Sequence, residues 1–204
     1  LEVEFTQNIS HAEPGESVSL SVRVHNKGDI DVNSSFDVTL WLSDDASYSS
    51  SDLYLGSFSV SSLSAGSQLN RDVTVTIPGD TPQEEYDIIA YADKDNDIDE
   101  SDESDNTDNE HVSIYHELSP PTGLSAQAVS VTEIEVTWDA VDYADWYIID
   151  MQNITARYGR SSTNFTKSNL EPNTEYFFRV KAKSDWIESG FTGYVLEHTL
   201  LETP

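Results

Sequence analysis

The chain has 204 residues, with 38 Asp and Glu against 10 Lys and Arg, so its formal net charge at pH 7 is −28. Such an acidic surface repels phosphate backbones and anionic lipid headgroups, and no run approaches the roughly 20 apolar residues of a membrane-spanning helix, so we expect neither a nucleic-acid partner nor membrane insertion. The chain contains no Cys, which excludes a disulfide framework, a thiolate zinc site and a cysteine nucleophile.

The length allows one large domain or two small ones. The chain opens LEVEF, without an initiator Met or a signal-peptide pattern, so we expect a piece of a larger protein.

Apolar and polar residues alternate with a period of two along much of the chain. In 18–24 (VSLSVRV) the Val and Leu side chains share one face, and the Ser and Arg side chains share the other. The same alternation recurs further along the chain, in 36–42, 73–77, 86–90, 134–138 and 176–180. These segments are bounded by Gly, Pro, Asn, Asp or Ser, which predicts half-buried antiparallel strands. Because no segment keeps an apolar stripe of helical period, the pattern indicates an all-β fold of sandwiches or barrels.

Pro120 and Pro121 interrupt the strand pattern, because proline cannot donate to a β-ladder and stiffens the chain. Residues 1–116 carry 25 acidic and 4 basic residues, whereas residues 117–204 carry 13 and 6. The first segment is rich in Ser and Asp, and the second holds three of the four Trp. We therefore predict two domains, 1–116 and 117–204, joined by a linker of restricted motion.

The second domain has the sequence features of a known sandwich family. PPTGL at 120–124 and IEVTW at 134–138, with its Trp, have the form of the first two strands, and Tyr147 follows in a third. LEPNTEYFFRV at 170–180 contains a Leu-x-Pro-x-Thr-x-Tyr corner followed by an alternating strand. These features resemble the fibronectin type III family over nearly the whole domain. The resemblance implies that Tyr176 is a corner tyrosine bonded to backbone upstream, but it does not imply one function.

The first domain resembles a different family. Its segments include PGES at 14–17, VRVHNKG at 22–28, LSAGS at 63–67 and, most distinctively, DKDNDIDESDESDN at 93–106. Together these resemble the CARDB family, a cell-adhesion-related domain of bacteria and archaea. The family pattern of Asp, Asn, two Glu and an Asn–Asn pair is matched by Asp93, Asn96, Glu100, Glu103 and Asn106, with Asp105 in place of the first Asn of the pair.

The CARDB resemblance implies an immunoglobulin-type sandwich of about seven strands, found in secreted or surface-anchored proteins. The predicted fold of the chain is therefore two tandem immunoglobulin-like antiparallel β-sandwiches, CARDB-like at 1–116 and fibronectin type III at 117–204.

Residues 93–110 contain ten carboxylates and one base, Lys94. Like charges at this density repel one another, so a folded loop needs either a counter-charge or full solvation. Calcium takes about 6–8 hard oxygen ligands, which this stretch offers as carboxylates, Asn carbonyls and loop backbone. The spacing is not that of an EF-hand, because counting from Asp93 puts Ile98 at the Gly position and Ser104 at the bidentate Glu position.

A second acidic group, Asp44, Asp45 and Asp52, lies in the segment SDDASYSSSD. Because loops distant in sequence can meet at one end of a sandwich, we expect this loop to approach 93–106. The hypothesis is that one or two calcium ions join the two loops, with a ligand set of Asp44, Asp52, Asp93, Asn96, Glu100 and Glu103. The alternative is a solvated acidic face, adapted to salt or seawater, that binds no particular ion.

Two tryptophans of the second domain are candidates for a ligand-binding platform. If Tyr147 points into the core, Trp146 points outward, and Trp186 lies in the last predicted loop, SDWIESGF. Flat rings at these positions could stack on sugar faces. The alternative is that both rings cover the edge of the core or the joint between the domains.

The chain shows no pattern of catalytic residues. None of its five His forms a His-Glu-x-x-His motif, and there is no Gly-x-Ser-x-Gly elbow and no Gly-rich phosphate loop. We therefore expect a non-catalytic extracellular module, a calcium-stabilised spacer or adhesion segment of a larger secreted or cell-surface protein. Its expected partners are flanking domains, a polysaccharide or a surface protein. The alternative is a substrate-binding accessory of a secreted hydrolase, which would hold a polysaccharide or a protein polymer through Trp146 and Trp186.

Overall fold

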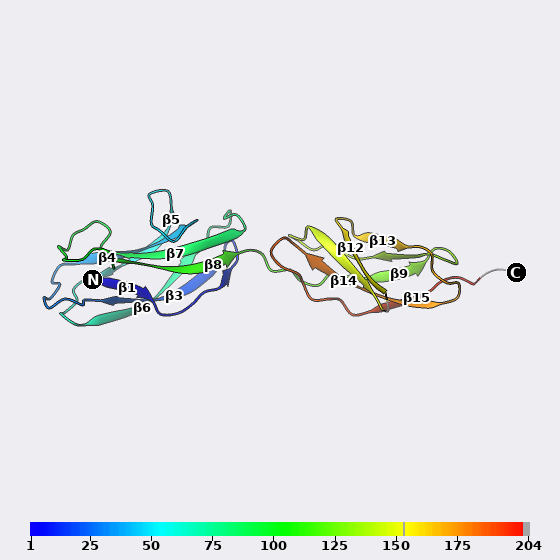
Figure 1. The fold of residues 1–204 in the computed structure, drawn as a ribbon, viewed down its shortest axis with the longest axis horizontal. Coiled ribbons are helices and arrows are strands. Elements are labelled where there is room, and N and C mark those ends of the chain that lie inside the picture. The colour runs from blue at the N-terminus through cyan, green and yellow to red at the C-terminus, as the bar shows by residue number, and fades with distance from the viewer. Residues whose placement is uncertain (153, 202–204) are drawn as a thin grey trace. The chain divides into compact units, whose positions relative to one another are not determined.

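The structure is a computed structural model that describes residues 1–152 and 154–201, with the backbone alone for 154–160. The chain divides into two compact units, Leu1–His116 (unit 1) and Glu117–Pro204 (unit 2). Each unit consists of strands and connecting loops (Figure 1). The described residues contain no helix, so they include none that is long and apolar enough to cross a membrane. The predicted all-β fold of two immunoglobulin-like sandwiches is confirmed.

Unit 1 packs its strands as two sheets. They are β1 (Glu2–Phe5), β2 (His11–Ala12), β3 (Ser17–His25), β4 (Phe36–Ser43), β5 (Leu53–Val60), β6 (Gln68–Thr76), β7 (Glu84–Ala92) and β8 (Thr107–Ile114). One sheet has the order β1-β3-β6 and the other has the order β2-β8-β7-β4-β5. All neighbouring strands are antiparallel except β2 and β8, which are parallel.

The core of unit 1 is built by the alternation that the sequence shows. Every second residue of β3 is buried, namely Val18, Leu20, Val22 and Val24, and the same holds for Phe36, Val38, Leu40 and Leu42 of β4. Because β3 and β4 belong to different sheets, these two rows face each other across the sandwich. Burial stabilises the fold by about 1.5–3 kcal/mol for each such side chain.

Unit 2 is a smaller sandwich. Its strands are β9 (Ser125–Ala128), β10 (Ile134–Thr137), β11 (Trp146–Met151), β12 (Ile154–Arg160), β13 (Asn164–Lys167), β14 (Glu175–Lys183) and β15 (Val195–His198). The sheet orders are β13-β10-β9 and β12-β11-β14-β15. Buried Trp138 and Tyr147 pack edge to face, with ring centroids 5.4 Å apart.

Tyr176 occupies the corner that its sequence context predicts. Its hydroxyl accepts a hydrogen bond from the backbone N–H of Glu171 at 2.9 Å, five residues upstream. Its half-buried ring packs against the core. The predicted corner tyrosine is confirmed, and it fixes the turn that leads into β14.

Candidate functional site

The loop between β7 and β8, residues 93–106, begins with a buried aspartate. Asp93 is 4% exposed and adopts a left-handed backbone conformation, with φ 51°. Its carboxylate accepts the backbone N–H groups of Asp97 at 3.0 Å and Ile98 at 2.9 Å. Asn96, also left-handed at φ 56°, donates its N–H to the Asp93 carbonyl at 2.9 Å. Asp93 and Asn96 therefore shape the first turn of the loop, and their described hydrogen bonds stay within that turn and its contact with β4.

Glu100, Glu103 and Asn106 meet at the other end of this loop. The Asn106 side chain is 1% exposed, and its Nδ2 donates to Glu100 Oε1 at 3.1 Å and to Glu103 Oε2 at 2.8 Å. The backbone N–H of Glu100 donates to Glu103 Oε1 at 3.3 Å. Two carboxylates therefore converge on one neutral amide group, and we call these three residues the Glu–Glu–Asn cluster.

The Glu–Glu–Asn cluster leaves buried oxygens without a hydrogen-bond partner. Asn106 Oδ1 is buried and unpartnered, and so is Oδ1 of the neighbouring Asp105. An unpartnered buried polar atom costs about 1–3 kcal/mol. Two such oxygens beside two carboxylates make a region that is rich in acceptors and poor in donors.

Positive charge near the Glu–Glu–Asn cluster is sparse. The amino group of Leu1 pairs with Glu100 Oε2. Among the described residues, no Lys, Arg or His side chain pairs with Glu100 or Glu103. Lys94, the base within the loop, instead donates to Asp95 at 2.9 Å, and this pairing raises the pKa of Lys94.

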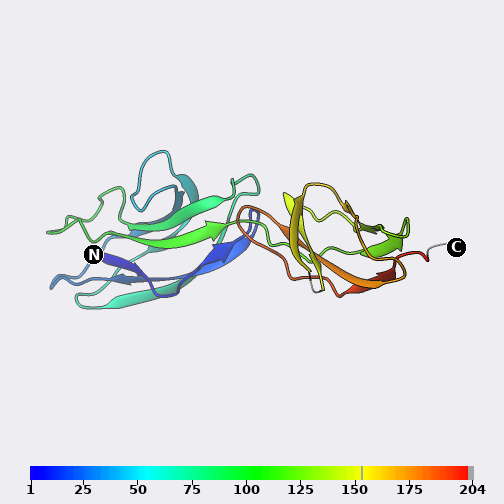
Figure 2. The same cartoon turned by 45° about the vertical axis from the view of Figure 1, so that its right-hand side comes forward.

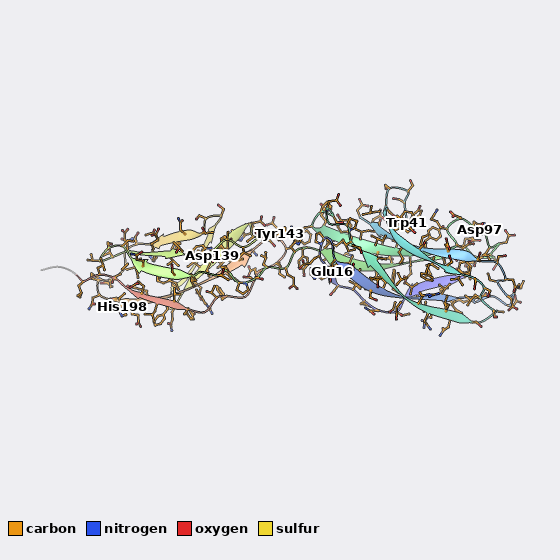
Figure 3. The ribbon with its side chains drawn as sticks, turned by 180° about the vertical axis from the view of Figure 1, so that it is seen from behind. Glu16, Trp41, Asp97, Asp139, Tyr143 and His198 are labelled. Carbon is orange, nitrogen blue, oxygen red and sulfur yellow. The ribbon has the colours of Figure 1, made fainter. Side chains whose placement is uncertain are left out.

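An open cavity of about 720 Å³ lies beside the cluster. It is lined by residues 26–34, by 97–102 and by Leu1 and Asp105, so its wall carries carboxylates from two loops. Figure 3 shows Asp97, one of the lining residues, on this loop of unit 1, far from Glu16 at the opposite end of the same unit. The cavity therefore opens at the end of the sandwich that the 93–106 loop occupies.

The two acidic loops leave the sheet at opposite ends of the β4–β7 pair, although Tyr48 of the first loop reaches the ring of Tyr91, just before the second. β4 ends at Ser43, which pairs with Asp87 near the start of β7, whereas Val38 of β4 pairs with Ala92 at the end of β7. The 44–52 loop follows the first of these pairs and the 93–106 loop follows the second. Five strand residues separate the pairs, roughly 17 Å, and a calcium ion reaches its ligands at about 2.3–2.6 Å. One ion cannot join the two loops at these strand ends.

Asp44 and Asp52 have other surroundings. Asp52 accepts the N–H and the hydroxyl of Ser49, at 2.8 and 2.7 Å, and so closes its own turn. Both aspartates line a second cavity, of about 460 Å³, together with Asp80 and Glu84. Within the described residues, no three His, Asp or Glu side chains converge in an arrangement that could hold a metal ion. The Glu–Glu–Asn cluster has two carboxylates and one amide.

Trp146 and Trp186 differ in their surroundings. Trp146 is half-buried, and the Lys183 ammonium lies 6.0 Å from its ring centroid. Trp186 is 40% exposed, in a turn where Ser184 Oγ accepts its backbone N–H. Trp146 therefore carries a covering side chain, and Trp186 presents the more open ring.

A cluster of four rings on unit 1 was missed by the sequence reasoning. Trp41 contacts Tyr48 and Tyr54, and Tyr48 contacts Tyr91, all edge to face with centroids 5.1–5.4 Å apart. Trp41 is visible in Figure 3. Trp41 pairs across the sheet with Ile89, which is 1% exposed yet lies outside the sandwich core. The sequence contains a sign of this cluster, because Trp41 and Tyr91 are aromatic residues at positions that the alternation assigns to the outer, polar face of their strands.

Comparison with known families agrees with this architecture. The CARDB family model matches residues 1–110, and the fibronectin type III domain model matches residues 119–195. A search of curated proteins finds no match.

The chain is similar to solved structures of CARDB and fibronectin type III domains. The solution structure of the CARDB domain of PF1109 from Pyrococcus furiosus is 22% identical, covers 57% of this chain and 94% of that one, and has a TM-score of 0.46. A crystal structure of the same domain in complex with di-metal ions is 22% identical, covers 56% and 84%, and has a TM-score of 0.43. The FN1–FN3 domains of chicken CNTN1 are 14% identical, cover 95% and 69%, and have a TM-score of 0.41. Because the CARDB model spans more than half of the sequence, the chain belongs to the CARDB family, with its CARDB domain followed by a fibronectin type III domain.

Proposed function

We propose that this chain is a non-catalytic tandem module whose CARDB domain is stiffened by a calcium ion, and that it serves as a spacer or adhesion segment of a larger secreted or cell-surface protein. CARDB and fibronectin type III domains are non-enzymatic β-sandwich modules that commonly occur in extracellular proteins. This supports the non-catalytic part of the proposal. The calcium part depends on the Glu–Glu–Asn cluster.

The environment of Asn106 carries the calcium proposal. Its amide is held between Glu100 and Glu103 by Nδ2, while Oδ1 is buried without a partner. Turning the same amide by 180° exchanges the two atoms and directs Oδ1 at the two carboxylates. Three oxygens facing one another repel, with the Leu1 amino group on Glu100 as the one cation beside them among the described residues, and they become a set of ligands when a calcium ion binds.

The donor atoms of the cluster suit calcium. Carboxylate and amide oxygens are hard ligands, and Ca²⁺ accepts irregular sets of about 6–8 of them. Glu100, Glu103 and Asn106 would hold the ion. Because the described residues supply two carboxylates at this point, backbone oxygens and water would complete the set. The bound ion would supply two positive charges to a loop whose own cation, Lys94, is paired with Asp95.

The spacer role has better support than the accessory role. Binding a polymer through a flat platform requires rings that are open on one side. Trp146 lies against Lys183, which leaves Trp186 as the more exposed of the two rings, and one exposed aromatic residue is common on any protein surface. We therefore retain the substrate-binding accessory as the second candidate function.

Thermal unfolding in excess calcium and in excess chelator tests the proposal. A ligand present at about 100 times its dissociation constant stabilises the folded state by about 2.7 kcal/mol, which corresponds to a rise of about 11 °C in the Tm of a domain of the size of unit 1. Glu103→Gln removes one carboxylate from the cluster, so we expect it to abolish most of this rise.

Asp99→Asn is the matched control, because it removes one charge from the same loop while leaving the Glu–Glu–Asn cluster intact. It should keep the calcium-dependent rise. Equal Tm values for the natural chain in calcium and in chelator would contradict the proposal and favour a solvated acidic face.

A further inference from the structure

The first twelve residues of unit 1 run beside the chain that leaves the 93–106 loop. In Figures 1 and 2 the β1 arrow and the β8 arrow point in the same direction and lie next to each other. β1 belongs to the three-stranded sheet and β2 to the five-stranded sheet, so this segment crosses from one sheet to the other. We call residues 3–12 and 105–115 together the zipper.

Backbone N–H groups of the first segment are bonded in order along the second. Val3 donates to the carbonyl of Asp105 at 3.2 Å. Phe5 donates to Asp108 Oδ2 at 2.7 Å, and Ile9 donates to Glu110 Oε1 at 3.1 Å. The contacts advance in the same direction on both segments, which is the order that parallel chains require.

At the end of the zipper near residues 10–12 and 113–115, the hydrogen bonds join backbone groups of both segments. The N–H of Ser113 donates to the carbonyl of Ser10, and the N–H of Tyr115 donates to the carbonyl of Ala12, both at 3.2 Å. These bonds include the short parallel pairing of β2 with β8. The carboxylates of Asp108 and Glu110 therefore bridge the stretch in which the first segment changes sheets.

The carboxylates protect an edge of β1. One side of β1 pairs with β3, and Val3 and Phe5 point their N–H groups to the other side, where the zipper receives them. Strand edges with free N–H groups are places where sheets open or pair with other chains. Removing an acceptor there leaves a backbone N–H without a hydrogen-bond partner.

The zipper begins next to the Glu–Glu–Asn cluster. Asp105, whose carbonyl accepts the Val3 N–H, directly precedes Asn106, whose side chain holds Glu100 and Glu103. We infer that the zipper is a conformational lock on the first strand, and that a cation bound at the Glu–Glu–Asn cluster tightens it by fixing Asp105. The second half of this inference rests on the proposed calcium site.

Amide hydrogen exchange in calcium and in chelator tests the lock. In calcium, exchange at Val3 and Phe5 should slow by about fivefold or more, the lower end of ordinary coupling between two sites. Val73 on β6, which pairs with Leu20 of β3, is the internal reference, because β6 lies at the opposite edge of the same sheet from β1. Exchange at Val3 and Phe5 that is unchanged or faster in calcium would overturn the coupling.

Asp108→Ala separates the lock from the ion. It removes the acceptor of the Phe5 N–H, so exchange at Phe5 should rise in calcium and in chelator alike, whereas calcium affinity measured by calorimetry should stay unchanged. Asp108→Asn retains an oxygen acceptor and should largely restore slow exchange at Phe5. An Asp108→Ala variant with natural exchange at Phe5 would overturn the lock itself.

Calorimetry of the natural chain with calcium distinguishes failure of this inference from failure of the proposed function. Binding that leaves exchange at β1 unchanged overturns the coupling and keeps the calcium site. An absence of binding overturns both the calcium site and its coupling to the zipper.

Discussion

At the scale of single residues, backbone conformation decides which side chains unit 2 can accept. Gly123 adopts φ +64°, and a Cβ atom there would lie 2.5–2.8 Å from the carboxylate of Asp139. That carboxylate is held in place, because Thr122 donates its hydroxyl to Asp139 Oδ2 at 2.8 Å. Glycine is therefore favoured at this position by its left-handed backbone conformation, and an added Cβ would also displace the exposed carboxylate of Asp139.

We expect Gly123→Ala to destabilise the chain by about 2–3 kcal/mol, measured by urea unfolding, because strain and a steric clash act together. Gly193→Ala is the matched control, since a Cβ there would meet nothing within 4 Å and its φ is not in the left-handed range. Similar losses in the two variants would contradict the strain assigned to Gly123.

Residue-scale roles in the acidic loop were only partly readable from the sequence. The pattern singled out Asp93, Asn96, Glu100 and Glu103 without distinguishing them, because every acid in a charged run has the same composition signal. The structure separates Asp93, which forms a turn, from Glu100 and Glu103, which form the cluster. The Asp93 carboxylate accepts backbone N–H groups within its own turn. Which acidic residue forms a turn and which joins the cluster depends on the conformation of the loop, and the spacing of the residues in the sequence does not predict that conformation.

At the scale of elements, the 44–52 loop is held by rings rather than by charges. Tyr48 packs edge to face on Trp41 and on Tyr91, which come from β4 and β7. The loop thereby lies over the outer face of the sheet, where Ile89 is buried. Aromatic pairs contribute about 0.5–1.5 kcal/mol each beyond the area they bury.

We expect Tyr48→Ala to lower the free energy of unfolding by about 2 kcal/mol, because it removes the ring contacts with Trp41 and Tyr91. Urea unfolding measures this loss. Ile30→Ala serves as the control, since Ile30 is a largely exposed apolar residue of another loop and should change stability by less than about 0.5 kcal/mol. A loss in Tyr48→Ala as small as that of the control would show that the rings do not hold the loop.

The strands β3, β4, β6, β7, β10 and β14 were predictable from the sequence because each contains an alternating segment that reports its own buried face, whereas β5 and β8 were not among these segments. The relative placement of the loops was not predictable. β4 and β7 are antiparallel neighbours, so the loops that follow them leave from opposite ends of the sheet. Which strands become neighbours is set by long-range pairing, and a local period of two contains no information about it.

At the scale of the whole molecule, the charge of −28 is distributed unevenly. Residues 1–116 hold 25 of the 38 acidic residues, and ten of these lie in 93–110. Carboxylates outside the 93–106 loop, such as Asp108 and Glu110, accept backbone N–H groups within the fold. The 93–106 loop concentrates acceptors where Asn106 is buried with an unpartnered oxygen.

A calcium titration followed by NMR at the Asn106 side-chain amide tests the central claim most directly. If calcium binds at the Glu–Glu–Asn cluster, the Asn106 amide signals shift and saturate at one equivalent of calcium, because the amide turns to present Oδ1 to the ion. Asn109, whose Nδ2 donates to Asp87 at 2.8 Å outside the loop, is the internal reference and should stay unchanged. Asn106 signals that do not move, or that move only in parallel with Asn109 as salt increases, would contradict the claim.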